Sequence, residues 1–477
     1  MAQVLTLVVL GTAGYVAWSK FLAWERAGRR ELVVGAVLAV LLADLLLYAS
    51  QNDVPIGVFR LAVFGQSFRL PEIVLVLALV ARLVVHGGAR RVGPVGLALL
   101  AWCLWYALSG VFGIFNGHDP KDVLYEAKAI LYIGGGVALL TGVDLGRMVS
   151  PRAIGRWFVA VGLLTVVMFP LTMRESYYPV ALPGLEVDHL GEIGADGSSA
   201  LVILAIAALM IEGVRRRRRS LIALAAVPML FSVFSGTQRA AMLALASALV
   251  ALVVFALGPT WRRRVRAHPT TIFLGLVAVA AVAAGVALVE IRQGERLPVA
   301  AVYEDSFEAT GKQQSADVRL LLWRQGDELF DERPLLGHGL GVPVEVRVPL
   351  TNRVIDSGFH NIGYDLVTRT GLFGVGLFVL AIALCVREGL LAWRRHADAR
   401  VAALAAAAIV GAASLLTKGM FEDVLDKHRL SILLGLLLGC MVAAGRAVRD
   451  HHDVDEDAVD AEIELRHGIG AEVPAWS

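Results

Sequence analysis

Five polar residues in the second half of this 477-residue chain have side chains suited to an anionic substrate. Arg239, Arg319 and Arg324 carry planar guanidinium groups, which donate paired hydrogen bonds to phosphate oxygens and stay charged at any working pH. His360 supplies an imidazole, the side chain that most often accepts a proton at neutral pH. Asn361 follows it directly and, with Arg324, is expected to support the others. Residues of these types predict a site that binds a diphosphate and removes a proton from a hydroxyl group.

Each of these residues also has a plainer interpretation. Arg239 begins an apolar run and would suit the lipid headgroup level, while Arg319 would be solvated or paired with a glutamate. A lone histidine such as His360 is more often a satisfied polar residue than a base. Gly371 and Gly374 are small residues one helical turn apart, which predicts close helix packing.

The composition places these residues in a membrane protein. The chain is 57% hydrophobic and only 18% charged, with a mean hydropathy of +0.67, and is therefore far more apolar than a soluble globular protein. Its net charge of +2 does not indicate nucleic-acid binding, because the basic residues form short clusters between apolar runs. Cys103, Cys385 and Cys440 lie within such runs, which predicts buried thiols and neither a disulfide nor a metal site.

Apolar runs of about 17 to 25 residues are long enough to cross the hydrocarbon core as helices. The sequence therefore predicts an all-α polytopic membrane protein with about 12–13 transmembrane helices. The predicted spans are 3–19, 31–50, 70–86, 93–115, 123–142, 154–172, 197–212, 220–235, 240–257, 271–290, 361–385, 401–417 and 429–446.

The basic clusters between these spans set the orientation, because short cytoplasmic loops collect lysine and arginine. A single choice puts every cluster on the cytoplasmic side, with the N-terminus outside and the C-terminus inside. The clusters are Lys20, Arg26, Arg29 and Arg30; Arg90 and Arg91; Arg147, Arg152 and Arg156; Arg215 to Arg219; Arg262, Arg263, Arg264 and Arg266; and Arg394, Arg395 and Arg400.

This topology divides the chain into five regions. Residues 1–230 and 231–290 hold transmembrane helices, the second region including Arg239. Residues 291–360 form one long outer loop, 361–447 hold the last spans, and 448–477 form an acidic cytoplasmic tail expected to be disordered. The outer loop contains an amphipathic stretch, DVRLLLWRQGDELF. This stretch is expected to lie on the bilayer or the bundle, or to form a lid over a site.

Three motifs in the second half resemble a known family. HNIGYDLVTRTGLFG, from His360 to Gly374, fits the pattern H-[NSQ]-x9-G-x-x-G of the O-antigen ligase and polymerase family of membrane glycosyltransferases. SGTQRAAM around Arg239 resembles that family's small-residue-then-arginine motif at the start of a helix. Arg319, followed by Trp323 and then by RPLLGHGLG, resembles its long-loop signature. The resemblance covers about residues 230 to 385.

The resemblance implies an integral enzyme with a GT-C-like fold in the bacterial inner membrane, whose active site faces the periplasm or exterior. Such an enzyme transfers a glycan from an undecaprenyl-diphosphate carrier to a hydroxyl group of a glycan or lipid-glycan acceptor, without a cofactor or required metal. Carried over to this sequence, Arg239 and Arg319 would hold the diphosphate and His360 would assist the acceptor. All three are then expected within about 12 Å of one another, the combined reach of arginine side chains around a diphosphate.

Other functions remain open at this level. The sequence does not separate a ligase from a polymerase. A transporter or flippase of lipid-linked saccharides would show paired repeats and charges near the bilayer midplane, whereas the polar residues here concentrate in an outer loop. A scaffolding protein explains the helices but not the histidine and arginines. The enzyme interpretation is therefore preferred.

Overall fold

The structure is a computed structural model that describes residues 2–46, 61–63, 66–87, 93–148, 180–182, 185–187, 239–257, 311–347, 354–356, 358–422 and 424–468. Its helices are α1 Ala2–Arg26, α2 Arg30–Leu46, α3 Leu70–His86, α4 Pro94–Phe115, α5 Pro120–Ala129, the π-helical turn η2 Ile130–Gly134, α6 Gly135–Leu140, α7 Leu145–Met148, α11 Arg239–Leu257, α15 Gly311–Glu332, α16 Ile362–Arg395, α17 Ala399–Gly419 and α18 His428–Gly468. Three two-stranded antiparallel hairpins pair β1 Leu61–Val63 with β2 Gln66–Phe68, β3 Val180–Leu182 with β4 Leu185–Val187, and β5 Glu345–Arg347 with β6 Val354–Asp356.

The described chain is an all-α polytopic membrane protein. Within the described residues, five helices are long and apolar enough to cross a membrane: Pro94–Phe115, Pro120–Leu140, Ile362–Arg395, Ala399–Gly419 and His428–Arg449. They coincide with the spans predicted at 93–115, 123–142, 361–385, 401–417 and 429–446. The spans predicted at 3–19, 31–50, 70–86 and 240–257 are helical where described. Those predicted at 154–172, 197–212, 220–235 and 271–290 lie outside the described residues.

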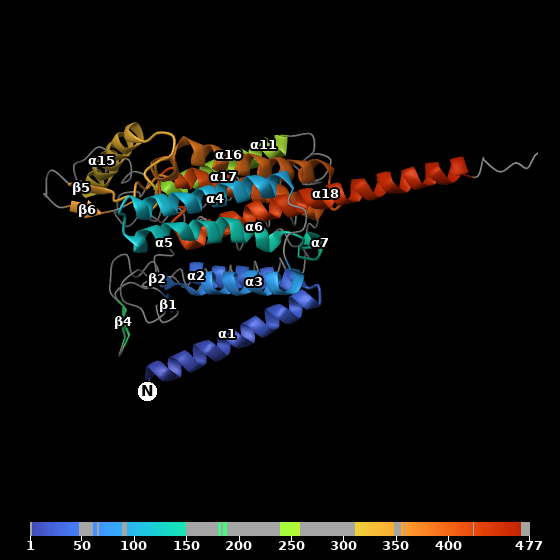
Figure 1. Cartoon of the computed structure of the whole chain (residues 1–477), viewed down its shortest axis with the longest axis horizontal. Helices are drawn as coiled ribbons and strands as arrows, with labels where there is room; N and C mark the ends of the chain where they lie inside the picture. Colours follow the sequence, from blue (N-terminus) through green and yellow to red (C-terminus); the bar gives the residue numbers. More distant parts are fainter. Residues whose placement is uncertain are drawn as a thin grey trace, which may run out of the picture.

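The centre of the bundle is α18, which packs against α6, α16 and α17 (Figure 1). Helix α4 covers another side of α16, and α11 lies along α17. The start of α16 and the end of α4 lie at the same end of the bundle as α15 and the β5–β6 hairpin, while α7 and the end of α16 lie at the other (Figure 1). The end that carries α15 is called the outer end here, because the arginine pattern predicts that it faces outward.

Capping residues define the helix ends that frame the outer end. Asp119 accepts a hydrogen bond from the Lys121 amide at 2.8 Å, and Pro120 occupies the first turn of α5, where its missing amide donor is harmless. At the opposite end Asp398 caps α17 by accepting from the Arg400 amide at 2.8 Å. The short connection between α16 and α17 makes them antiparallel neighbours.

Helix α18 extends into the acidic tail. Helix α18 continues without a break to Gly468 and projects beyond the bundle (Figure 1). Between Arg449 and Gly468 the sequence contains neither proline nor glycine and is rich in aspartate and glutamate. No helix breaker interrupts the segment, so it extends a helix that the bundle has already nucleated.

Candidate active site at the outer end

His360 has an unusual backbone conformation. Its φ angle is +53°, and it is the only residue other than glycine with positive φ in the described part of the chain. Histidine, asparagine and aspartate tolerate this region better than most residues, but it still costs about 1–3 kcal/mol and persists only where the surroundings enforce it. The contacts of its two neighbours, Phe359 and Asn361, show what enforces it.

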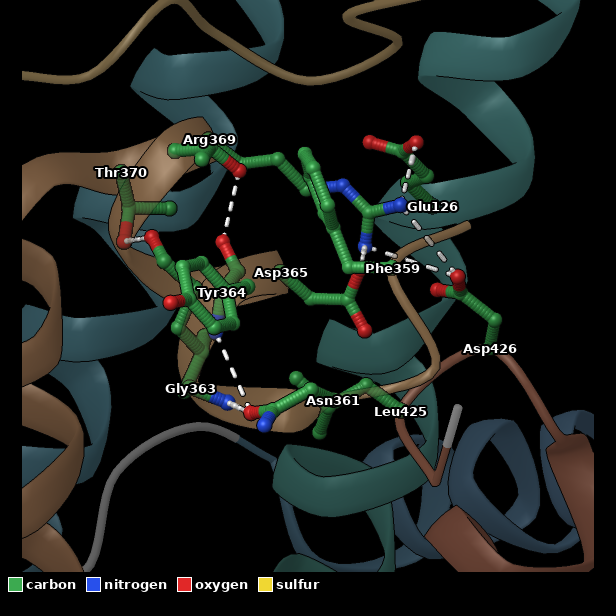
Figure 2. Close-up of polar contacts among 12 residues, drawn as sticks. Glu126, Phe359, Asn361, Gly363, Tyr364, Asp365, Arg369, Thr370, Leu425 and Asp426 are labelled. Carbon is green, nitrogen blue, oxygen red and sulfur yellow. Dashed lines mark hydrogen bonds and ion pairs between the residues drawn. The ribbon is translucent and has the colours of Figure 1, made fainter. Parts of the chain in front are cut away.

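Asn361 caps α16. Its side-chain oxygen accepts hydrogen bonds from the backbone amides of Gly363 at 2.8 Å and Tyr364 at 3.3 Å, and its own backbone is extended with φ −155° (Figure 2). Asparagine is among the strongest helix N-caps because it satisfies amides that have no partner within the helix. Asn361, predicted to support His360, thus starts the helix immediately after that histidine.

Helix α15 holds the other side of His360. The Trp323 indole donates from Nε1 to the carbonyl of Phe359 at 3.0 Å, and its ring stacks on Tyr364 with 5.9 Å between centroids. Tyr364 in turn donates its hydroxyl to Asp327 at 2.9 Å. Leu322 and Phe359 are fully buried in a small apolar cluster beneath these contacts. The amphipathic stretch is thus a helix docked on the start of α16.

Gly371 breaks the helical backbone of α16 nine residues after its first residue. Its φ is +67°, and a side chain there would collide with the carbonyl of Leu335. The break leaves carbonyls without partners in the helix. Two of them accept hydrogen bonds from a glycine-rich turn, residues 337–341: the His338 backbone amide donates to the Thr368 carbonyl at 2.8 Å, and the Gly339 amide donates to the Arg369 carbonyl at 3.0 Å. Residues 361–370 therefore form a separate helical unit, called the motif block below.

The glycines predicted to allow close packing have different roles. Gly374 does pack closely, since a β-carbon there would lie 2.9 Å from Trp105. Gly371 instead provides a backbone conformation that residues with side chains rarely adopt. Gly337, Gly339 and Gly341 also have positive φ, which lets the turn fit between α4, α5 and α16.

A buried ion-pair cluster lies beneath the motif block. Arg369 is only 3% exposed, and its guanidinium contacts Glu126 at 2.9 Å, Asp426 at 3.4 Å and Asp365 at 3.6 Å (Figure 2). Glu126 also accepts the backbone amide of Gly341 at 2.7 Å through its second oxygen. The cluster thus joins α5, α16, the glycine-rich turn and the turn before α18.

The sequence interpretation did not include these four charged residues. Asp365 and Arg369 lie inside the motif but at its unspecified positions, and Glu126 lies within a predicted span. Ionisable residues within transmembrane segments are costly and almost always paired, so their presence alone was a usable signal. What the sequence lacked was the pairing, because Glu126 and Asp426 are remote from the motif.

The three arginines singled out in the sequence lie on two helices, α15 and α11. Arg319 lies on α15 four residues before Trp323, hence about one helical turn from the indole that bonds beside His360. Arg324 is exposed on the same helix. Arg239 is the first residue of α11, and its side chain lies outside the described part.

The backbone around Arg239 can still be located. Ser414 of α17 donates to the Ala244 carbonyl of α11 at 2.7 Å, and these residues lie at matching distances from the outer ends of their helices. Gly419 lies at the end of α17, and a β-carbon placed on it would be 3.2 Å from the side chain of Ile362. The start of α11 is therefore near the motif block.

Residues 224–379 match the O-antigen ligase family. The chain carries an O-antigen ligase domain. The resemblance drawn from the three motifs is thus confirmed, and the domain supports a glycosyltransferase role in O-antigen or polysaccharide assembly. No curated protein matches the chain. The O-antigen ligase domain includes Arg239, α15, the glycine-rich turn and the motif block, whereas Glu126 and Asp426 lie outside it.

Proposed function

We propose that this protein transfers a glycan from an undecaprenyl-diphosphate carrier to an acceptor hydroxyl at the periplasmic face of a bacterial inner membrane. The O-antigen ligase domain supports the reaction class. The observation that carries the proposal for the site is His360, which is held in a strained conformation between the Trp323 contact and the Asn361 cap. Strain enforced from both sides is typical of functional residues.

In the proposed reaction the acceptor oxygen attacks the anomeric carbon, and the bond from that carbon to the diphosphate oxygen breaks. His360 takes the hydroxyl proton, and the lipid diphosphate leaves with the bonding electron pair. Arg239 and Arg319 stabilise the negative charge that develops on the leaving group. Direct attack opposite the leaving group inverts the configuration of the sugar carbon.

Arginine suits this task because its planar fork matches two phosphate oxygens, whereas lysine presents a point charge. Arg239→Lys and Arg319→Lys are therefore expected to weaken donor binding and to slow transfer. Fixed guanidinium groups supply the positive charge for the leaving group, so transfer is expected to persist in the presence of a chelator. Transfer assays with and without EDTA test the second expectation directly.

The main test measures transfer from a lipid-linked oligosaccharide by protein reconstituted in liposomes. His360→Ala is expected to lower the rate by about a hundredfold or more, the usual contribution of a positioned base, while donor binding and melting temperature stay near wild type. His396→Ala is the matched control, because His396 is similarly half-buried but lies at the opposite end of α16.

Three other outcomes have distinct meanings. A near-wild-type rate for His360→Ala would remove the general-base role. Lost donor binding with intact folding would assign His360 to the diphosphate. Movement of the lipid-linked glycan across the bilayer without formation of a new glycosidic bond would instead favour a transporter.

A further inference from the structure

We infer that Arg369 is a positioning residue for His360, acting through the motif block; the catalytic part of this inference rests on the proposed function. Arg369 is separated from His360 by the length of the block and is buried on its inner side. Its role would be to fix where the block sits and, with it, the histidine at the block's outer end.

The motif block is set apart from the rest of α16 at both ends. His360 and Gly371 both have positive φ, so the regular helical hydrogen-bond ladder does not extend past either residue. A short helix of this kind has little stability of its own and takes its position from tertiary contacts. The position of His360 therefore depends on whatever holds the sides of the block.

Two sets of contacts hold the outer and back sides. Trp323 and Asp327 of α15 contact Tyr364, and the glycine-rich turn donates to the carbonyls of Thr368 and Arg369. Both α15 and the turn belong to the same connected segment before the block. These contacts hold the block against α15 and the glycine-rich turn, but neither set joins the block directly to α5 or to the turn before α18.

The Arg369 side chain makes that connection. Its guanidinium contacts Glu126 on α5, Asp426 in the turn before α18 and Asp365 within the block (Figure 2). The second oxygen of Glu126 accepts from Gly341, so one carboxylate ties both the block and the glycine-rich turn to α5. A planar guanidinium can meet several carboxylates at once, whereas a lysine ammonium at the same place cannot reach all three in the same geometry.

The proposed test compares Arg369→Lys with Glu388→Gln, both in the full-length protein in nanodiscs. Glu388 is also buried and ion-paired on α16, but its partner is Arg449 on α18 at the opposite end of the bundle. Glu126→Gln provides a second variant if Arg369→Lys does not fold. The readouts are hydrogen exchange of peptides covering residues 334–341 and 358–364, melting temperature, and transfer of a lipid-linked oligosaccharide.

Arg369→Lys is expected to speed exchange in both peptides by about tenfold, as local opening becomes easier. It should also lower kcat by about ten- to a hundredfold with little change in KM for the donor, because small displacements of a reacting group are costly. Glu388→Gln should leave exchange at these peptides and kcat unchanged even if it lowers the melting temperature.

Unchanged exchange at 358–364 in both Arg369→Lys and Glu126→Gln would overturn the inference, as would faster exchange with a wild-type kcat. If wild-type protein transferred no glycan, the proposed function would fail, but the exchange comparison would still decide whether Arg369 holds the His360 segment. If Glu388→Gln lowered melting temperature and kcat in parallel, loss of any buried ion pair would slow transfer, and Arg369 would be a purely structural residue.

Discussion

The outer segment of α16 and the contact between α6 and α18 use glycine in opposite ways. Gly136 and Gly435 keep helical backbones and bring α6 and α18 together, since a β-carbon on Gly136 would lie 2.7 Å from the Gly435 backbone. Gly371 instead reverses φ and breaks its helix. At the α6–α18 contact the glycines allow two helical backbones to pack closely. At Gly371 the break frees carbonyl groups of α16 to accept hydrogen bonds from a turn. Glycine within an apolar run therefore indicates either close helix packing or an interruption of the helix.

The largest effect is expected for Gly371→Ala. With φ +67° and ψ −179°, Gly371 occupies a region that is essentially restricted to glycine, where a side chain costs about 1–3 kcal/mol; the collision with Leu335 adds a further penalty, so unfolding free energy should fall by about 2–5 kcal/mol. Because the break also positions the motif block, the transfer rate of the folded fraction should fall as well. Chemical denaturation and transfer assays on the same sample measure both. A normal rate per folded molecule would make the break a packing feature only.

A smaller and purely structural effect is expected for Gly435→Ala. The added methyl group would meet the carbonyl of Tyr132 and overpack the α6–α18 contact, which should lower stability by about 1–3 kcal/mol. The rate per folded molecule should equal that of wild type. If this variant slowed transfer as much as Gly371→Ala does, the distinction between the two regions would collapse.

The smallest effect is expected for Asn361→Ala, which removes the cap but leaves the block's other contacts. Loss of an N-cap costs about 1 kcal/mol, and a loosened first turn should reduce transfer several-fold. Asn361→Ser keeps a capping oxygen and should retain most of the activity and stability. Equal losses in both variants would show that Asn361 acts through something other than capping, such as contact with substrate.

Much of the fold was predictable because the length of a hydrophobic run is a local signal. Among the described residues, the five helices long enough to span a membrane begin and end within about three residues of their predicted positions, except that α16 continues ten residues past its predicted end at 385. The charge of residues 448–468 predicted disorder, whereas the absence of proline and glycine after an established helix lets α18 continue to Gly468.

The site was only partly predictable. The motif drew attention to His360, Asn361 and Gly371, but their conformations depend on backbone angles that residue identity alone does not give. Gly371 was expected to serve packing because glycine has the same signature in both uses. Two of the three partners of Arg369, Glu126 and Asp426, lie more than fifty residues from it in opposite directions, so pattern reading within the motif had no means of pairing them.

The number of residues between His360 and Gly371 sets the distance and rotation between the histidine and the ion-pair cluster. Each residue added to an α-helix advances it by about 1.5 Å and turns it by about 100°. One inserted residue within the motif block would therefore rotate His360 away from its present direction while Arg369 stayed in the ion-pair cluster. Substitutions at the block's half-buried positions leave this interval intact, whereas a single insertion or deletion does not. The length of the block, more than the identity of its central residues, relates the histidine to the buried charges.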